Sequence, residues 1–167
     1  ESARLDNIIT DFLDFAKPKI PDLHPCRIEE IIEKNIVYLS PRIEDYNLNI
    51  IKEISKNLPE IMADSAMLHQ AFLNIFINAF QSLKRNGCLT IRIKYDSGNI
   101  VINFLDNGDG IPEEILKKIW TPFFTTKDTG TGLGLGIVKN MIEAHKGIIS
   151  ITNTNPKGAN VEIRLPV

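Results

Sequence analysis

Residues 129–136 read Thr-Gly-Thr-Gly-Leu-Gly-Leu-Gly, so glycine occupies every second position of this stretch. Residues 137–144 follow with helical periodicity, which places the glycines at the start of a helix. Glycines let the backbone approach a ligand closely, and the free N–H groups and positive dipole end of a helix N-terminus favour phosphate. A flexible linker is the alternative, but linkers combine Gly with Ser, whereas this stretch contains Leu133 and Leu135. We therefore predict a phosphate-binding loop.

The spacing of these glycines differs from the two commonest nucleotide-binding loops. A P-loop ends in Gly-Lys-Ser or Gly-Lys-Thr, and no such triplet follows here. The Rossmann and protein-kinase loops have the spacing G-x-G-x-x-G, whereas this one is G-x-G-x-G-x-G. Residues 121–129 also read as a loop and not as the strand that a Rossmann loop requires. The P-loop and the Rossmann-type spacing, which protein kinases share, are therefore both disfavoured.

Composition indicates an ordinary soluble globular chain. The 167 residues are 43% hydrophobic and 24% charged, which suits one domain with some excess length. A net charge of −2 provides no general attraction to nucleic acid or acidic membranes, so no nucleic-acid partner is expected. Cys26 and Cys88 match no metal-binding spacing and favour buried thiols in a reducing compartment.

The sequence shows neither a signal peptide nor an apolar run long enough to span a bilayer. We therefore expect a cytoplasmic location. The chain starts inside an apparent helix and has no initiator Met, so we take it for a fragment of a longer protein. Whether a membrane anchor precedes this sequence is a question that the sequence leaves open.

The first residues form an amphipathic segment. In residues 1–16 apolar side chains recur at spacings of three and four, which indicates one apolar helical face. Three prolines within residues 18–25 then stop any helix, so we interpret residues 18–25 as a linker or hinge. Such a short helix either continues upstream to meet a partner helix or folds back on its own domain, and the pattern does not decide between the two.

The rest of the chain alternates helices with strands and hairpins. We predict a helix over residues 65–85 that starts at Asp64 or Ser65 and ends near Gly87. Two hairpins are expected over residues 89–105 and 147–165. This mixture indicates an α+β sandwich with a largely antiparallel sheet. Further predicted elements are helices over residues 27–39 and 112–119 and strands over residues 47–54 and 60–63.

The long helix has no charged face, because residues 65–83 contain no Asp, Glu, Lys or Arg. A surface helix normally carries charge on its outer side, so this helix is expected to be covered on more than one side. Opposite its apolar stripe lie Asn74, Asn78 and Gln81. These amides either face ordered water or line a ligand pocket in which amide oxygens meet a cation. Mg²⁺ suits such a pocket when phosphates supply further oxygens.

An acidic turn, Asp106-Asn107-Gly108-Asp109-Gly110, ends the apolar strand before it. A lone Asp-x-Gly-x-Gly is more often only a turn, and the EF-hand pattern is not met. In the functional interpretation the Asp106 carboxylate accepts the exocyclic amine of adenine and repels the carbonyl of guanine. Six of the ten glycines lie between residues 108 and 136. This clustering favours a binding site.

Taken together, four motifs resemble those of the catalytic ATP-binding domain of sensor histidine kinases, in the superfamily of DNA gyrase, MutL and the heat-shock chaperone ATPases. Residues 73–79 resemble the N box, residues 106–110 the first glycine box, residues 122–127 the F box and residues 130–135 the second glycine box. Residues 158–166 resemble the closing strand, and residues 1–16 the end of the second helix of the dimerisation and phosphoacceptor domain. The resemblance covers essentially the whole chain. It implies a two-layer α/β sandwich of the Bergerat type over residues 26–167, with residues 1–17 belonging to the helical domain.

The resemblance also implies roles for individual residues. Asn74 and Asn78 would act in catalysis, with Asn78 ligating Mg²⁺, and Asp106 would recognise adenine. Residues 123–131 would form a lid that closes over ATP, as mobile loops commonly do in enzymes. The implied nucleotide-binding set is Asn74, Asn78, Gln81, Asp106, Gly108, Gly110, Ile111, Phe123, Thr126, Lys127, Gly130, Thr131, Gly132, Leu133, Gly134 and Leu135. The implied partners are the helical domain of the same protein, a response regulator receiver domain and a second copy in a homodimer.

The sequence departs from the family pattern in three respects. None of His24, His69 and His145 has the context of a phosphoacceptor, so the histidine that receives phosphate is expected outside this sequence. Gln81 stands where some members carry a basic residue facing the γ-phosphate. Ala159 replaces a hydroxyl residue often found beside the adenine pocket.

Two other functions compete with a histidine kinase that transfers phosphoryl from Mg·ATP. One is ATP hydrolysis for conformational gating, as in gyrase and the chaperones. By the same resemblance, those ATPases use a Glu at the position where this chain has Asn74. An amide cannot take a proton from water as a carboxylate does, so efficient hydrolysis is disfavoured. The other is a non-catalytic nucleotide-binding or dimerisation module.

Overall fold

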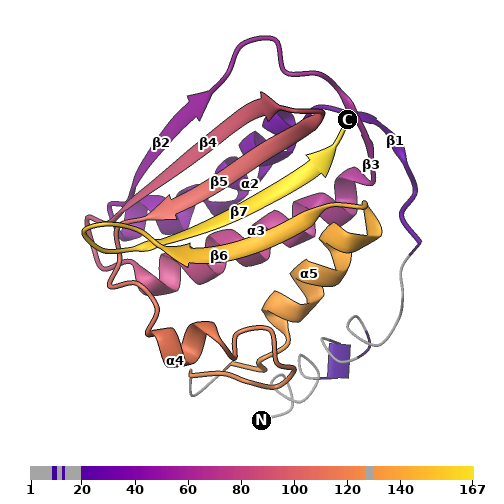
Figure 1. Ribbon diagram of the computed structural model, residues 1–167. Helices are drawn as coiled ribbons and strands as arrows, with labels where there is room; N and C mark the ends of the chain where they lie inside the picture. The colour runs from indigo at the N-terminus through magenta and orange to yellow at the C-terminus, as the bar shows by residue number, and fades with distance from the viewer. Residues whose placement is uncertain (1–8, 11–12, 14–19, 127–129) are drawn as a thin grey trace.

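The computed structural model describes residues 9–10, 13, 20–126 and 130–167 (Figure 1). The predicted helix over residues 1–16 lies largely outside the described residues. The helices of the described part are α2 (Ile28–Asp45), α3 (Ser65–Ser82), α4 (Glu113–Leu116) and α5 (Gly134–Ala144). The strands are β1 (His24–Cys26), β2 (Asn49–Ile54), β3 (Ile61–Ala63), β4 (Cys88–Asp96), β5 (Asn99–Asp106), β6 (Ile148–Asn153) and β7 (Ala159–Pro166).

Five strands form one sheet in the order β2-β4-β5-β7-β6. Strand β2 pairs with β4 in parallel, and the other three pairs are antiparallel. Both predicted hairpins form, and the first turns at Ser97 and Gly98, whose φ angles of 50° and 83° suit a two-residue hairpin loop. The prediction of a mixed, largely antiparallel sheet is confirmed.

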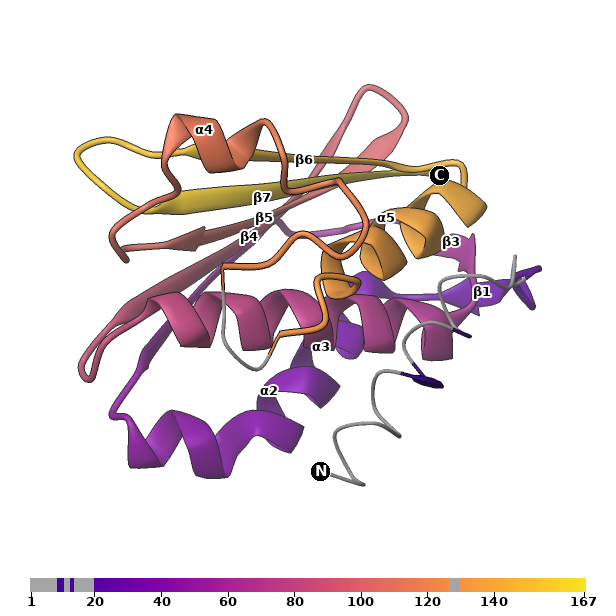
Figure 2. The ribbon, with the colours of Figure 1, turned by 90° about the horizontal axis from the view of Figure 1, so that it is seen from below.

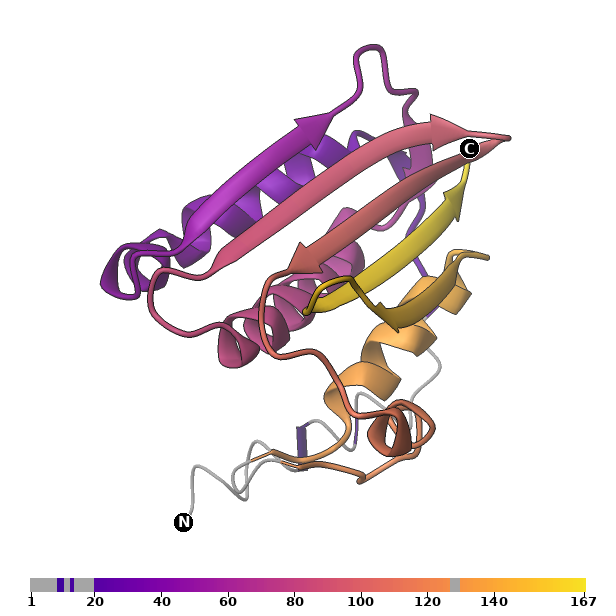
Figure 3. The ribbon, with the colours of Figure 1, turned by 60° about the vertical axis from the view of Figure 1, so that its left-hand side comes forward.

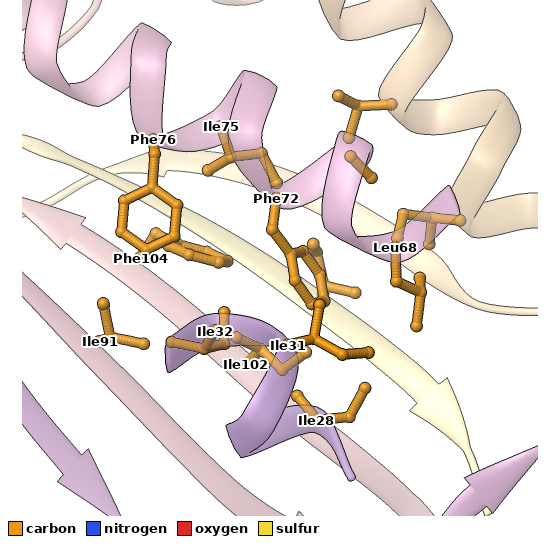
Figure 4. Packing of buried hydrophobic residues seen from close by; sticks show 14 of the residues in the cluster. Ile28, Ile31, Ile32, Leu68, Phe72, Ile75, Phe76, Ile91, Ile102 and Phe104 are labelled. Atoms are coloured by element: carbon orange, nitrogen blue, oxygen red, sulfur yellow. The ribbon is translucent and has the colours of Figure 1, made fainter. Parts of the chain in front are cut away.

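Helices α2, α3 and α5 all lie on one face of this sheet (Figures 2 and 3). The sequence prediction of a two-layer α/β sandwich is therefore confirmed. Between the layers, the rings of Phe72 and Phe76 from α3 lie 5.9 and 5.4 Å from the ring of Phe104 in β5. Figure 4 shows this aromatic group beside the isoleucines of α2, including Ile28 and Ile32. The sheet face and the uncharged helix thus bury each other.

The opposite face of the sheet carries a polar row that crosses all five strands. The strand register aligns Glu53, Arg92, Asn103, Glu162 and Ser150. The Nε of Arg92 donates to Glu53 at 2.6 Å, and the Nδ2 of Asn103 donates to Glu162 at 3.0 Å. Buried and more exposed residues alternate along β4 because one face meets the helices and the other meets solvent. The central strand β5 differs, since its residues 100–104 are all buried.

Helix α3 begins as predicted, since the carboxylate of Asp64 accepts hydrogen bonds from the N–H groups of Ala66 and Met67. It ends at Ser82, three residues before the predicted end at residue 85. Leu83 adopts an extended backbone conformation and is buried. Burial of this leucine therefore outweighs the helix propensity of Lys84 and Arg85.

Helix α2 runs to Asp45, six residues beyond the predicted end at residue 39, and includes Pro41. A proline lacks the N–H that would bond the carbonyl oxygen four residues earlier, which here is the oxygen of Val37. The Ser40 hydroxyl donates to that oxygen instead, at 2.8 Å. This substitute bond leaves the Val37 carbonyl satisfied as the helix continues past the proline.

The predicted linker over residues 18–25 is ordered at its end. His24 and Pro25 belong to β1, which pairs antiparallel with β3. Just before this strand, the N–H of Asp22 donates to the carboxylate of Asp64 at 3.1 Å. The last residues of the predicted linker or hinge are therefore tied to β3 and to the start of α3.

Candidate functional site

Two adjoining cavities lie beside α3. The first, here called the Asp106 cavity, has a volume of about 270 Å³ and lies between α3, β5, β7 and the segment around α4. Its wall is largely apolar and includes Ile75, Ala79, Phe104, Ile111, Ile115 and Val161. The carboxylate of Asp106 and the hydroxyls of Ser82 and Thr126 are among its few polar groups. A flat apolar ligand with one or two polar atoms would match this wall.

Asp106 occupies the end of β5, where several donors hold its carboxylate. Its Oδ1 accepts hydrogen bonds from the N–H of Gly108 at 2.9 Å and the N–H of Ala159 at 3.3 Å. Burial raises the pKa of this carboxyl above its usual value, and the bonds from Gly108, Ala159 and the Ser82 hydroxyl oppose that rise. The group is therefore a fixed acceptor in partly desolvated surroundings.

Glycines pack closely around this carboxylate. A Cβ at Gly108 would lie 2.9 Å from both the Asp106 Oδ1 and the backbone oxygen of Ser82. Gly158 has a φ of +112°, and a Cβ there would collide with the carbonyl group of Asp106. The lack of a side chain at Gly108 lets the acidic turn pack against the end of α3, and the lack of one at Gly158 lets the second hairpin approach Asp106.

The second cavity, here called the glycine-loop cavity, has a volume of about 580 Å³. It lies between α3, the segment after α4 and the glycine-rich loop. Asn78, Ile115, Ile119, Thr126 and Leu135 line both cavities, so the two adjoin. Its other lining residues are Thr10, Ile77, Gln81, Phe124, Thr125, Gly130, Thr131, Gly132 and Gly134.

The glycine-rich loop is fixed by its alternating residues. Leu133 is fully buried, whereas Leu135 is half-buried and lines both cavities, and Gly132 has a φ of +71°. A Cβ at Gly132 would lie 2.7 Å from the carbonyl oxygen of Phe123, whose own φ is +65°. A Cβ at Gly134 would meet no atom within 4 Å. The loop thus packs on residue 123 and enters α5 with its first turn beside the cavity.

The segment between α4 and the loop is also attached to α5. The side chain of Trp120, the one tryptophan of the sequence, lies under the ammonium group of Lys139 at 5.5 Å from the ring centroid. This is the geometry of a cation–π contact. Trp120 therefore lies beside α5, the helix that follows the glycines.

The structure brings together most of the residues expected at the site. Eleven of them line one or both cavities: Asn78, Gln81, Asp106, Gly110, Ile111, Thr126, Gly130, Thr131, Gly132, Gly134 and Leu135. Asn74 is half-buried and does not line these two cavities, and the side chain of Phe123 is 58% exposed. Gly108 and Leu133 do not line the cavities, but Gly108 packs beside the Asp106 carboxylate and Leu133 is buried within the glycine-rich loop. Lys127 lies outside the described residues.

Some lining residues were missed from the sequence. Ile115 and Ile119 were assigned only to a short helix, although their spacing of four was a usable signal for one apolar face. That helix, expected over residues 112–119, is regular only from Glu113 to Leu116. Ser82 also lines the Asp106 cavity, and only tertiary structure places it against Asp106. Phe124, which belongs to the predicted lid segment, lines the glycine-loop cavity. Ala159 lacks the hydroxyl often found at this position in the family, but the hydroxyl of Ser82 bonds Asp106 in the same cavity.

None of the three histidines lines either cavity. His24 is exposed and lies 3.1 Å from the Asp22 carboxylate, and the ring of His69 contacts Tyr38. His145 is buried at the end of α5. These positions are consistent with the expectation that the histidine receiving phosphate lies outside this sequence.

Comparison with known proteins decides the family. Residues 63–167 match the family model described as histidine kinase-, DNA gyrase B- and HSP90-like ATPase. The chain belongs to this ATPase family. The resemblance inferred from the four motifs is thereby confirmed.

Similar members of this ATPase family are sensor histidine kinases. The chain is 35% identical to sensor histidine kinase ZraS of Salmonella typhi, over all of this chain and 36% of that protein. It therefore spans about a third of the length of that relative. The catalytic domain of histidine kinase ThkA superposes with a TM-score of 0.81 at 29% identity, covering 87% of this chain and 95% of that one.

Two larger kinase structures are similar as well. Full-length ShkA in complex with AMPPNP has a TM-score of 0.86 at 27% identity, covering 97% of this chain and 35% of that one. ThkA in complex with response regulator protein TrrA has a TM-score of 0.85 at 26% identity, covering 98% of this chain and 47% of that one. The fold is therefore that of histidine kinase catalytic domains.

Within the described residues, no helix combines the length and apolarity needed to cross a membrane. Nor do those residues contain a group of three or more His, Cys, Asp or Glu side chains that could hold a metal ion.

Proposed function

We propose that this chain is the ATP-binding catalytic domain of a sensor histidine kinase. It would transfer the γ-phosphoryl group of Mg·ATP to a histidine on a helical domain of the same protein. The observation that carries this proposal is the pair of adjoining cavities, one with a fixed carboxylate and the other bounded by the glycine-rich loop and Asn78. The kinase names of its relatives and the AMPPNP bound to ShkA support it.

The Asp106 cavity fits an adenine base. Its apolar wall would contact the faces of the ring, and the Asp106 Oδ2, which receives neither of the two backbone N–H groups on Oδ1, would accept the exocyclic amine. Guanine presents a carbonyl at that position, and two acceptors would then face each other in partly buried surroundings. Loss of such a hydrogen bond discriminates strongly between ligands. Adenine is therefore the proposed base.

The glycine-loop cavity fits the phosphates. The N–H groups at the start of α5 and the positive end of its dipole favour an anion there, and the missing side chains leave room at Gly134. Gln81 lines this cavity but carries no charge, so the loop must provide more of the favourable interaction with the γ-phosphate than it would beside a basic residue.

Asn78 is the proposed Mg²⁺ ligand. It lines both cavities, so its amide oxygen lies between the proposed base and phosphate positions. Mg²⁺ retains several waters and often takes one or two protein oxygens together with phosphate oxygens. When bound, the ion would neutralise charge on the phosphates, while this chain's residues orient the nucleotide for in-line transfer.

ATP hydrolysis for conformational gating is the second candidate. The half-buried amide of Asn74 cannot act as the base that activates water. Comparison with kinases of the same fold also favours transfer over hydrolysis. We therefore assign Asn74 a supporting role and expect slow turnover of ATP by the chain alone.

The whole protein would have further parts and partners. We propose residues 1–17 as the end of the phosphoacceptor helix, residues 18–25 as the connection and residues 26–167 as the catalytic domain. A homodimer in the cytoplasm and a response regulator receiver domain are the proposed assembly and partner. The complex of ThkA with TrrA supports the last of these.

The test is transfer of labelled phosphate. This chain is mixed with γ-labelled ATP, Mg²⁺ and a longer form of the protein that carries the helical domain but has Asp106→Asn in its own site. Acid-labile, alkali-stable label on the longer form would support transfer to histidine. Rapid release of free phosphate without such label would favour the hydrolytic function instead. A parallel reaction with Asp106→Asn in both proteins measures the background.

A further inference from the structure

Three segments of the chain meet at one buried junction far from the Asp106 turn. The imidazole of His145, at the end of α5, is only 7% exposed. Its Nδ1 lies 2.7 Å from the carbonyl oxygen of Met141, one turn earlier in the same helix. Its Nε2 lies 2.9 Å from the backbone N of Asp64, at the start of α3. The ring therefore joins the last turn of α5 to the first turn of α3.

These two contacts determine the tautomer. A carbonyl oxygen can only accept, so Nδ1 must carry the proton and donate to Met141. A backbone N–H can only donate, so Nε2 must be unprotonated and accept from Asp64. The geometry is thus satisfied by one neutral form of the ring.

Asp64 extends the junction to the connecting segment. Its Oδ1 accepts hydrogen bonds from the N–H groups of Ala66 and Met67, and its Oδ2 accepts one from Asp22. Burial opposes ionisation of this carboxyl, but the three backbone bonds outweigh it and lower its pKa below the usual value. Asp64 therefore caps α3, donates its backbone N–H to His145 and accepts a hydrogen bond from the segment before β1.

The two helices that meet here carry the two sides of the proposed phosphate site. Helix α5 begins at Gly134 and Leu135, which line the glycine-loop cavity, and α3 carries Asn78. The helices pack on each other along the same face of the sheet (Figure 2). Helix α5 has 11 residues and is about 16 Å long. A rotation of α5 about its contact with α3 at one end therefore displaces the glycines at the other.

We infer that His145 is a positioning residue for the nucleotide site, acting through α5 on the glycine-rich loop. Its hydrogen bond to Asp64 sets how α5 lies against α3 and hence where the loop faces Asn78. His145 lines neither cavity and takes no part in the chemistry. This inference rests on the proposed nucleotide site and adds to it a residue outside the four motifs.

The decisive comparison is between His145→Leu and His145→Gln. Leucine fills much of the space but leaves the buried N–H of Asp64 without an acceptor, whereas the amide oxygen of glutamine can reach the position of Nε2. We expect His145→Leu to weaken binding of Mg·AMPPNP by roughly 10-fold. His145→Gln should recover most of that loss. Calorimetric titration well below the melting temperature of each variant measures both.

His69→Leu is the matched control, because it makes the same change at a partly buried histidine of α3 that contacts Tyr38 and lines neither cavity. It breaks no hydrogen bond of the buried Nδ1, which has no partner among the described residues, and it should leave the affinity for Mg·AMPPNP unchanged. Equal losses of affinity in His69→Leu and His145→Leu, or no recovery in His145→Gln, would overturn the inference. So would a folded His145→Leu that binds Mg·AMPPNP like the unchanged chain.

A measurement on the unchanged chain keeps the inference testable if His145→Leu does not fold. The sequence has three histidines, so long-range ¹H–¹⁵N spectra can assign each ring. We expect the proton of His145 on Nδ1, and a proton on Nε2 would contradict the junction. Failure of the unchanged chain to bind Mg·AMPPNP would refute the proposed function, whereas the tautomer would still report on the junction.

Discussion

The two halves of the site are built from different kinds of structure. The Asp106 cavity is bounded by strands and a long helix, and backbone N–H groups from two chain segments hold its carboxylate. The glycine-loop cavity is bounded largely by loop, where Phe123 and Gly132 adopt left-handed backbone conformations against each other. The base half is therefore fixed by the sheet, while the phosphate half depends on one loop conformation.

This difference separates the expected effects of mutation. A change in the base half should weaken binding of every adenine ligand, from adenosine to ATP. A change in the phosphate half should weaken binding of ATP and leave adenosine nearly unaffected. Binding of the two ligands, measured side by side, therefore assigns each residue to one half.

The largest effect is expected for Asp106→Asn. The amide places a donor or a weaker neutral acceptor opposite the amine of adenine, and a hydrogen bond to a charged group is lost in partly buried surroundings. Affinity for both ATP and adenosine should fall by roughly 100-fold in calorimetry. Asp109→Asn is the control, because Asp109 belongs to the same turn but is exposed and paired with Lys84. Unchanged affinity in Asp106→Asn would show that the Asp106 cavity does not bind the adenine base.

The next effect is expected for Gly132→Ala. The methyl group would press on the backbone of Phe123, and alanine disfavours a φ of +71°. Affinity for ATP should fall by about 10-fold while that for adenosine stays within experimental error. Gly98→Ala introduces a similar φ strain, at +83°, in a hairpin turn with no atom near its Cβ. It should lower the melting temperature but bind ATP normally, and a matching loss of affinity there would mean that the effect of Gly132→Ala is general destabilisation.

A smaller effect is expected for Asn78→Ala. One of several Mg²⁺ ligands would be replaced by water, so affinity for ATP should fall by about 5-fold with Mg²⁺ and much less with a chelator present. Asn74→Ala removes another half-buried amide one turn earlier and should bind Mg·ATP like the unchanged chain. Equal losses in the presence and absence of Mg²⁺ would argue against a metal ligand at Asn78.

The smallest effect concerns pH. Burial raises the pKa of Asp106, and only the ionised carboxylate accepts the amine. Adenosine affinity should therefore decrease on acidification at a pH above the range of an ordinary aspartate, and it is halved where pH equals this pKa. The stability contribution of a raised carboxyl pKa is present at low pH and lost as pH rises through that pKa. Asp106→Asn should accordingly melt no lower than the unchanged chain at pH 7, and a pH-independent adenosine affinity would contradict the role of the carboxylate.

The sequence was sufficient for the elements and motifs that local patterns determine. The alternation in β4, the Asp64 cap and the glycine spacing each follow from residues close together in the chain. The end of α3 was misplaced because burial of Leu83 is a tertiary effect, and α2 passes Pro41 because Ser40 satisfies the Val37 carbonyl. Residues far apart in the sequence, such as Ser82 and Asp106 or His145 and Asp64, meet only in the folded chain. Local pattern contains no signal for those contacts.

The most direct test of the account is a crystal structure of this chain with Mg²⁺ and AMPPNP. We predict that the base amine lies on the Asp106 carboxylate, that the phosphates contact backbone N–H groups between Gly130 and Leu135, and that the Asn78 amide oxygen ligates the metal. A nucleotide bound with its base away from Asp106, or with its phosphates outside the glycine-loop cavity, would contradict the claim that the two cavities form one ATP site.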